Sequence, residues 1–167
     1  LDSVGLQLRG RNLYDVEIFD ANNVFAVGTG TLAKYDFDAN VFRSETDLVG
    51  STQMNAVAFV SKDVVVAVGN GGTIFRRTVG TDGAPAWTKI TAPNGSTAAL
   101  NDVKFYGQTG YIVGGTSTLW VSTDGGATWT PSTAPNASNY SITRLGPNEF
   151  FIGSGSREIV RSELGVP

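Results

Sequence analysis

The sequence predicts an all-β protein made of one small sheet repeated along the chain, and three observations lead to this prediction. Short runs rich in β-branched residues, such as "AVAFV" and "VVVAVG", are bounded by residues that favour turns. No stretch keeps the 3.6-residue period of an amphipathic helix. The same order of apolar runs and glycines also returns about every 40 residues, which indicates a repeat architecture.

The repeat has four units. They begin at Leu13, Met54, Leu100 and Tyr140. A glycine ends the second apolar run of each unit, at Gly28, Gly69, Gly114 and Gly153, with separations of 41, 45 and 39 residues. An aliphatic residue follows at Leu32, Ile74, Leu119 and Ile159, and three units add an aromatic residue, at Phe42, Trp87 and Trp129. Four short strands in about 40–45 residues are typical of a β-propeller blade.

The two ends of the chain predict how the ring closes. The fourth unit stops one strand short, whereas residues 3–10, "SVGLQLRG", precede the first unit as an additional strand. Pairing this strand with the last blade would remove an open sheet edge. We therefore expect a four-bladed β-propeller forming one domain over residues 1–167. Its blades would span about 12–50, 51–98, 99–138, and 139–167 plus 3–10. The alternative is part of a six- or seven-bladed ring.

The segment "VSTDGGATWT", residues 121–130, contains Ser122, Asp124, Gly126 and Trp129 in an S-x-D-x-G-x-x-W pattern. This string resembles the Asp-box, or BNR repeat. The resemblance implies a hairpin between the third and fourth strands, with a structural role for these four residues. An aspartate that accepts from turn amides and a glycine at positive φ suit such a hairpin.

The wider pattern, "GGTIFRR" followed by "AWTKI" and then "VSTDGGATWTP", resembles photosystem II assembly-factor-type propellers and bacterial and viral surface propellers. A resemblance of this kind indicates the fold more specifically than the function.

The composition excludes several kinds of chemistry. The chain has no His and no Cys, which excludes Ser-His-Asp and Cys-His catalysis and the usual zinc and iron sites. The net charge is −3 and the 12 basic residues form no stripe, so nucleic acid is not an expected partner. The apolar runs are too short to span a membrane. We expect no catalytic residue, cofactor or metal, and interpret "DFDAN" at residues 36–40 as a polar turn.

Two surfaces are candidates for binding. The first strands would line the central axis, where the aligned residues are Glu17, Ala58, Lys104 and Arg144. We expect Glu17 to pair there with Lys104 or Arg144, because an unpaired buried charge is costly. The turns between second and third strands would form a second surface, since loops on rigid scaffolds carry function. Its predicted members are Thr29, Asn70, Thr116, Ser117, Ser154 and Arg157.

The predicted function is a non-catalytic interaction or structural module that docks onto other proteins, as an assembly factor or as a surface or virion decoration. An extracellular, periplasmic or particle-surface location is expected. One alternative is a lectin that binds glycans through Trp120, Tyr106 and Tyr111. A second is a fragment of a sialidase-like glycoside hydrolase, although no motif places three arginines around one carboxylate.

Overall fold

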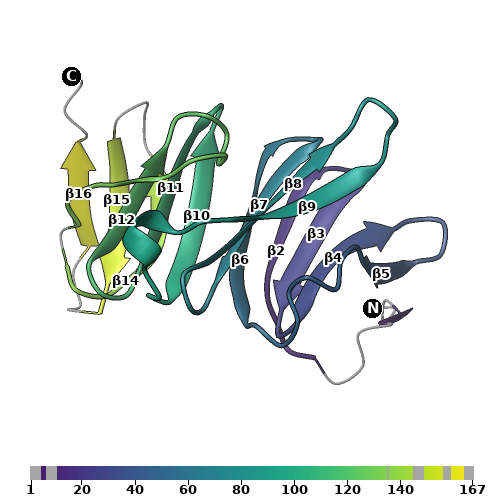
Figure 1. Cartoon of the computed structure of the whole chain (residues 1–167), viewed down its shortest axis with the longest axis horizontal. Helices are drawn as coiled ribbons and strands as arrows, with labels where there is room; N and C mark the ends of the chain where they lie inside the picture. Colours follow the sequence, from purple (N-terminus) through teal and green to yellow (C-terminus); the bar gives the residue numbers. More distant parts are fainter. Residues whose placement is uncertain (1–4, 7–10, 135, 145–148, 156–158, 164–167) are drawn as a thin grey trace.

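The computed structural model describes residues 5–6, 11–134, 136–144, 149–155 and 159–163. These residues form four β-sheets placed one after another along the molecule, as Figure 1 shows. In the described part of the chain there is no α-helix, only a single 3-10 turn at Pro93–Gly95. The predicted all-β class is therefore confirmed. None of the described residues forms a helix long and apolar enough to cross a lipid bilayer.

Sheet 1 has the order β1-β5-β4-β3-β2, and the other sheets follow the chain order of their strands. Sheet 1 contains β1 (Gly5–Leu6), β2 (Leu13–Asp20), β3 (Asn23–Gly28), β4 (Thr31–Asp36) and β5 (Val41–Ser44). Sheet 2 contains β6 (Met54–Ser61), β7 (Val64–Gly69), β8 (Thr73–Val79) and β9 (Pro85–Ile90). Sheet 3 contains β10 (Leu100–Tyr106), β11 (Thr109–Gly114), β12 (Thr118–Ser122) and β13 (Thr130–Pro131). Sheet 4 contains β14 (Asn139–Arg144), β15 (Glu149–Ser154) and β16 (Ile159–Glu163).

The first strand of every sheet carries a bulge at its start. The register shifts fall at Leu13/Asp15, Met54/Ala56, Leu100/Asp102 and Asn139/Ser141. Each bulge adds one residue directly before the position held by Val16, Val57, Val103 and Ile142. The four sheets can therefore be aligned residue by residue. This alignment corrects one anchor of the sequence repeat: Ser154, not Gly153, is the counterpart of Gly114, since Asn139 pairs with Ser154 and Leu100 with Gly114.

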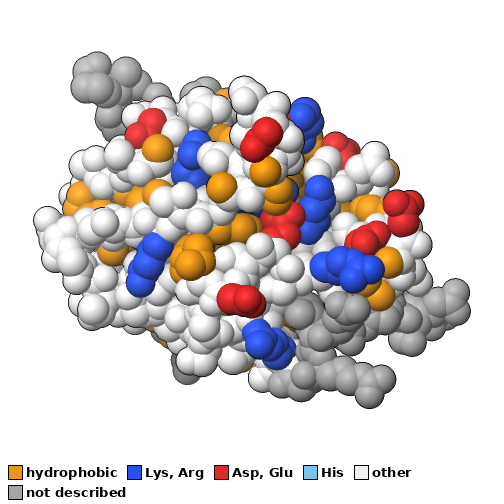
Figure 2. Space-filling model, turned by 45° about the vertical axis from the view of Figure 1, so that its right-hand side comes forward, with side chains coloured by type: hydrophobic (Ala, Val, Ile, Leu, Met, Phe, Trp, Pro, Cys, Tyr) orange, Lys and Arg blue, Asp and Glu red, His pale blue; other side chains and the backbone are white. Residues whose placement is uncertain are grey.

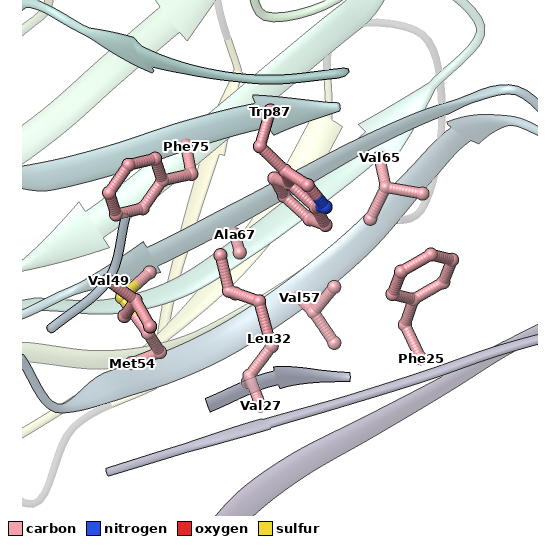
Figure 3. Packing of buried hydrophobic residues seen from close by; sticks show 10 residues of the cluster. All are labelled: Phe25, Val27, Leu32, Val49, Met54, Val57, Val65, Ala67, Phe75 and Trp87. Carbon is pink, nitrogen blue, oxygen red and sulfur yellow. The ribbon is translucent and has the colours of Figure 1, made fainter. Parts of the chain in front are cut away.

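The core lies between the faces of neighbouring sheets. Figure 3 shows the cluster between sheets 1 and 2, formed by Phe25, Val27, Leu32, Val49, Met54, Val57, Val65, Ala67, Phe75 and Trp87. A second cluster joins sheets 2 and 3, and a third joins sheets 3 and 4. Sheets 2 and 3 are thus buried on both faces, which explains their nearly continuous apolar strands.

The structure does not show the predicted closure of the ring. Gly5 and Leu6, from the predicted strand 3–10, form β1, which pairs in parallel with β5 and not with β16. Residues 3–4 and 7–10 lie outside the described residues. Sheets 1 and 4 lie at opposite ends of the molecule in Figure 1. In the described ranges no extensive contact joins them.

The innermost strands pack in sequence, β2 against β6, β6 against β10 and β10 against β14. In the described ranges no comparable contact leads from β14 back to β2. The four sheets therefore form an open arc.

Candidate functional site

The predicted Asp-box residues lie in the turn between β12 and β13. Ser122 Oγ donates to Asp124 Oδ1 over 2.8 Å and accepts from the N–H of Gly126 over 2.9 Å. Asp124 also accepts from the N–H and the hydroxyl of Thr128, at 2.9 and 2.6 Å. Burial pushes the pKa of Asp124 up, but the hydrogen bonds from Thr128 and Ser122 outweigh it, so the pKa falls to about 2. The carboxylate thus closes the turn in its charged form.

This turn is packed against the neighbouring sheet. Gly126 has a φ of +80°, and a Cβ there would lie 2.6 Å from Val66 Cγ2 of β7. Trp129 is buried in the cluster between sheets 2 and 3, with its ring 5.8 Å from that of Phe105. Arg76 of β8 donates to the carbonyl of Gly125 over 2.8 Å. The contacts of the turn therefore run to sheets 2 and 3.

Sheets 1 and 2 are joined by a buried ion pair that the sequence does not predict. Arg77 of β8 donates through Nε and Nη2 to the two carboxylate oxygens of Glu45, at 2.6 and 3.0 Å. Trp87 Nε1 donates to the same carboxylate over 3.1 Å, and the guanidinium lies 5.1 Å from the ring centre of Phe25. Nothing in the sequence pairs Glu45 with Arg77, because 32 residues separate them.

The turns between second and third strands make regular backbone hydrogen bonds. We call the surface formed by Thr29, Asn70, Thr116, Ser117 and Ser154 the turn face. Thr29 donates its N–H to Asn12 and Asn70 to Gln53, so these turns are tied to the start of their own sheet. Ser117 N–H donates to Ala137, at the entry to the next sheet. Thr116 and Ser117 are exposed at positive φ, and Arg157 lies outside the described residues.

Polar side chains link the inner edges of neighbouring sheets. Asp15 Oδ2 accepts from the N–H of Val57 and Asp102 Oδ2 from that of Ile142, both over 2.9 Å. Two asparagines act in the same way: Asn55 donates to the carbonyl of Leu100 and Asn101 to that of Asn139, both over 2.8 Å. These side chains thus satisfy backbone N–H and C=O groups at the strand edges, which an open edge would otherwise offer to another chain. Asp15 and Asp102 share one position of the repeat, which is the sequence signal that could have predicted this bridge.

The innermost strands carry a mixed charge cluster. We call Glu17, Asp102, Lys104, Tyr106 and Arg144 the axial surface. Lys104 Nζ lies 3.6 Å from Asp102 Oδ1, so the lysine pairs with this aspartate and not with Glu17 as predicted. Burial raises the pKa of Glu17, with Lys104 opposing the rise and nearby carboxylates adding to it. Burial likewise raises the pKa of Asp102, against the hydrogen bond from Ile142 N–H and the charge of Lys104.

Arg144 is one position out of the predicted alignment. Thr143 pairs with Phe151 as Lys104 pairs with Tyr111, so Thr143 is the counterpart of Lys104. Arg144 faces sheet 3 instead, and its guanidinium lies 4.3 Å from the ring centre of Tyr106 and 5.4 Å from that of Tyr111. The physical reason is that Asn139, a buried polar residue, occupies the position that Leu100 holds in sheet 3, so an alignment on the apolar Tyr140 is one residue out.

The axial surface offers ionic, stacking and hydrogen-bonding groups suited to holding a ligand. Of the predicted glycan platform, Trp120 and Tyr111 are buried in the core, and only Tyr106 is exposed. Across the described ranges no group of three or more acidic side chains could hold a metal ion. Figure 2 shows charges of both signs scattered between apolar side chains on the visible face, without a broad patch of one sign.

These features define a class: an all-β repeat protein built from propeller-type blades with a BNR-type hairpin. Residues 39–155 match the family described as photosynthesis system II assembly factor YCF48. Because this match covers more than half of the 167 residues, the chain belongs to that family. The resemblance inferred from the sequence is confirmed. No curated protein matches the sequence closely.

The solved structures similar to the chain include one of YCF48 and two of designed proteins. A structure of YCF48 bound to D1 peptide is 25% identical with a TM-score of 0.57, covering 66% of this chain and 38% of that one. The computationally designed protein Ika4 is 15% identical with a TM-score of 0.75, covering 99% of both chains. The computationally designed protein Ika8 is 15% identical with a TM-score of 0.73, covering 97% of this chain and 49% of that one. The chain thus spans well under half of the matched YCF48 chain and about half of Ika8.

The family corrects the expected location. An extracellular, periplasmic or particle-surface protein was expected, but the family and the YCF48 structure belong to a photosystem II assembly factor, not to an extracellular or virion protein. The expectation rested on low charge and abundant polar turn residues. Sheets with many hairpins need polar turn residues in any cellular compartment, so the composition does not indicate where the protein acts.

Proposed function

We propose that this chain is a non-catalytic binding module that holds an extended segment of a partner protein during assembly. The observation that supports this most strongly is membership in the assembly-factor family, together with the similar YCF48 structure that holds a D1 peptide. The absence of His and Cys from the whole sequence agrees with a binding role, because it removes the commonest nucleophile–base pairs.

We place the bound segment on the axial surface. Tyr106 is exposed, and Lys104 is partly exposed beside it on β10. Arg144 stacks on Tyr106, so a cation and an aromatic ring are already held in fixed positions. A preorganised site of this kind loses little conformational entropy when it binds. The inner strand edges are bridged by Asp15, Asn55 and Asn101, so side chains and not strand addition would make the contacts.

Peptide binding tests the proposal. A fluorescently labelled D1 peptide is titrated with the full chain and followed by anisotropy at low and at physiological salt. The variant Lys104→Glu is expected to weaken binding at least tenfold, because it reverses a charge at the centre of the site. Lys89→Glu is the matched control, since Lys89 is exposed on β9, the outermost strand of sheet 2, and should leave binding unchanged.

The outcomes separate the partner class from the site. If the unmodified chain does not bind the peptide, the proposed partner class is wrong. If it binds but Lys104→Glu has no effect while Thr116→Glu abolishes binding, the peptide lies on the turn face. Equal weakening by Lys104→Glu and Lys89→Glu would show that the attraction is non-specific.

A further inference from the structure

Sheet 1 carries an open groove beside its β4–β5 hairpin, on the face that it turns toward sheet 2. The groove has a volume of about 500 Å³. Its polar lining consists of Asn22, Lys34, Asp36, Asp38, Arg43 and Glu45. Lys34 lies two residues after Leu32, which packs in the cluster between sheets 1 and 2, so both side chains project from the same face of β4. The groove therefore faces sheet 2 and does not depend on any part of a longer chain before sheet 1.

The corresponding place on sheet 2 is filled by a turn of sheet 3. Arg76 is the counterpart of Lys34, since each is the fourth residue of the third strand of its sheet. Arg76 donates to the carbonyl of Gly125 over 2.8 Å. Gly126 approaches Val66 so closely that a Cβ on the glycine would lie 2.6 Å from Val66 Cγ2. The Asp-box turn thus occupies the groove that sheet 2 would otherwise leave open.

Sheet 2 does not fill the groove on sheet 1 in the same way. Residues 81–86, at the tip of the β8–β9 hairpin, are all exposed, whereas Gly125 and Gly126 of the Asp-box turn are buried. A Cβ on Gly83 would meet nothing within 4 Å. None of the described residues that line the groove comes from sheet 2. The groove on sheet 1 therefore has the place of an Asp-box turn but not the turn itself.

The charges around Lys34 are already paired within the chain. Arg43 Nε lies 2.7 Å from Asp36 Oδ2, and the carboxylate of Glu45 holds Arg77. Lys34 is half-buried, and no described residue forms a hydrogen bond or an ion pair with its side chain. Among the described residues of the lining, Lys34 is thus the cation left to meet an incoming carbonyl or carboxylate.

We infer that this groove is a docking site for an acidic, glycine-containing turn of a partner protein, held as sheet 2 holds the Asp-box turn. Lys34 donates to a carbonyl of the turn as Arg76 does, and its charge complements the aspartate of such a turn. Glycines let the backbone of the turn approach the sheet closely. Phe37 lines the groove and is 47% exposed, and it offers an aromatic surface like that of Phe105 beside Gly126. The inference is independent of the proposed peptide binding, because the axial surface lies on the first strands and the groove on β4 and β5.

A cyclised peptide with the sequence of residues 122–128, STDGGAT, tests the inference. It is added at up to about 5 mM to the isotope-labelled full chain, since a short turn buries little area and binds weakly. Backbone amide shifts followed by NMR should change in β4, β5 and the β2–β3 turn, and should saturate.

Variants of the chain test the role of the lysine. Lys34→Glu should weaken binding by at least about tenfold, because it reverses the charge that faces the turn. Lys34→Arg should keep binding, since arginine holds this position in sheet 2. Lys62→Glu, at an exposed lysine between β6 and β7, is the matched control and should bind like the unmodified chain.

A second peptide tests the need for glycine. The same cyclic sequence with Gly125→Val and Gly126→Val should not bind, because its side chains prevent the close approach. Far-UV circular dichroism checks that each variant chain is folded, and if Lys34→Glu fails to fold, the two peptides and Lys34→Arg still decide the question. No shift changes with STDGGAT would overturn the inference, and so would equal binding of the valine peptide. Shift changes centred on Val66 and Arg76 would also overturn it, because they would show that the peptide displaces the Asp-box turn of the chain itself.

Discussion

At the scale of single residues, the Asp-box turn offers an internal comparison. Gly126 and Gly83 lie between the third and fourth strands of neighbouring sheets and have nearly equal φ values, +80° and +79°. Their surroundings differ, because a Cβ at Gly126 would meet Val66 at 2.6 Å and a Cβ at Gly83 would meet nothing within 4 Å. The two positions therefore separate the cost of backbone strain from the cost of a clash.

Gly83→Ala is expected to lower the free energy of unfolding by about 1 kcal/mol, which is the cost of a left-handed backbone conformation for alanine. Gly126→Ala should cost at least about 1 kcal/mol more, because the methyl group overpacks the contact with Val66. Urea unfolding followed by tryptophan fluorescence measures both. Equal losses would mean that the turn moves away from sheet 2 without penalty.

The carboxylate of Asp124 gives a pH-dependent prediction. Its folded pKa of about 2 lies below the ordinary 3.8, so its contribution to stability is present above pH 4 and is lost as the pH falls toward 2. Asp124→Asn is expected to be less stable than the unmodified chain at pH 6, with the difference shrinking between pH 4 and 2. Thermal unfolding across this range tests it. Asp47→Asn, at an exposed aspartate, is the control, and a constant difference for Asp124→Asn would argue against the mechanism.

At the scale of elements, sheet-to-sheet contacts combine apolar packing with polar bridges. The pair Arg77–Glu45 is almost fully buried between sheets 1 and 2, whereas Arg43–Asp36 is largely exposed at the outer edge of sheet 1. Because the Arg77–Glu45 pair is shielded from water, removing one partner would leave the other as a buried, unpaired charge, which is strongly unfavourable. Solvent screens the charges of the exposed Arg43–Asp36 pair, so losing one partner costs little.

Glu45→Gln is therefore expected to destabilise the chain by about 3 kcal/mol, because Arg77 keeps its charge but loses the opposing one. Arg43→Gln should change stability little. Chemical unfolding of both variants provides the measurement. A small effect of Glu45→Gln, similar to that of Arg43→Gln, would show that water reaches Arg77.

At the scale of the whole molecule, the four sheets depend on one another because each neighbouring pair shares a buried cluster. Leu32→Ala, which removes a fully buried side chain between sheets 1 and 2, is expected to lower the free energy of unfolding by about 3 kcal/mol. Tryptophan fluorescence and far-UV circular dichroism should report the same shifted midpoint in urea, because we expect the stack to unfold as one unit. Separate midpoints for the two signals would show that the sheets unfold independently.

The sequence by itself determined the repeat, its strands and the family resemblance, because these depend on local signals. Glycines that end strands and the Asp-box turn act within a few residues, and the alternation of apolar runs is visible in one dimension. In the fourth unit Asn139 and Ser154 hold the positions of Leu100 and Gly114, so the apolar and glycine signals placed Arg144 and Gly153 one residue out of register.

Only the tertiary structure decided which charges meet and how far the stack of sheets turns. Glu45 meets Arg77, and Lys104 meets Asp102 instead of Glu17, because packing brings distant strands together in ways that spacing does not reveal. The four units predicted a closed ring only on the assumption that the number of blades sets the curvature. The curvature depends on how neighbouring faces pack, which spacing along the chain does not reveal, and in the described ranges sheets 1 and 4 stay apart.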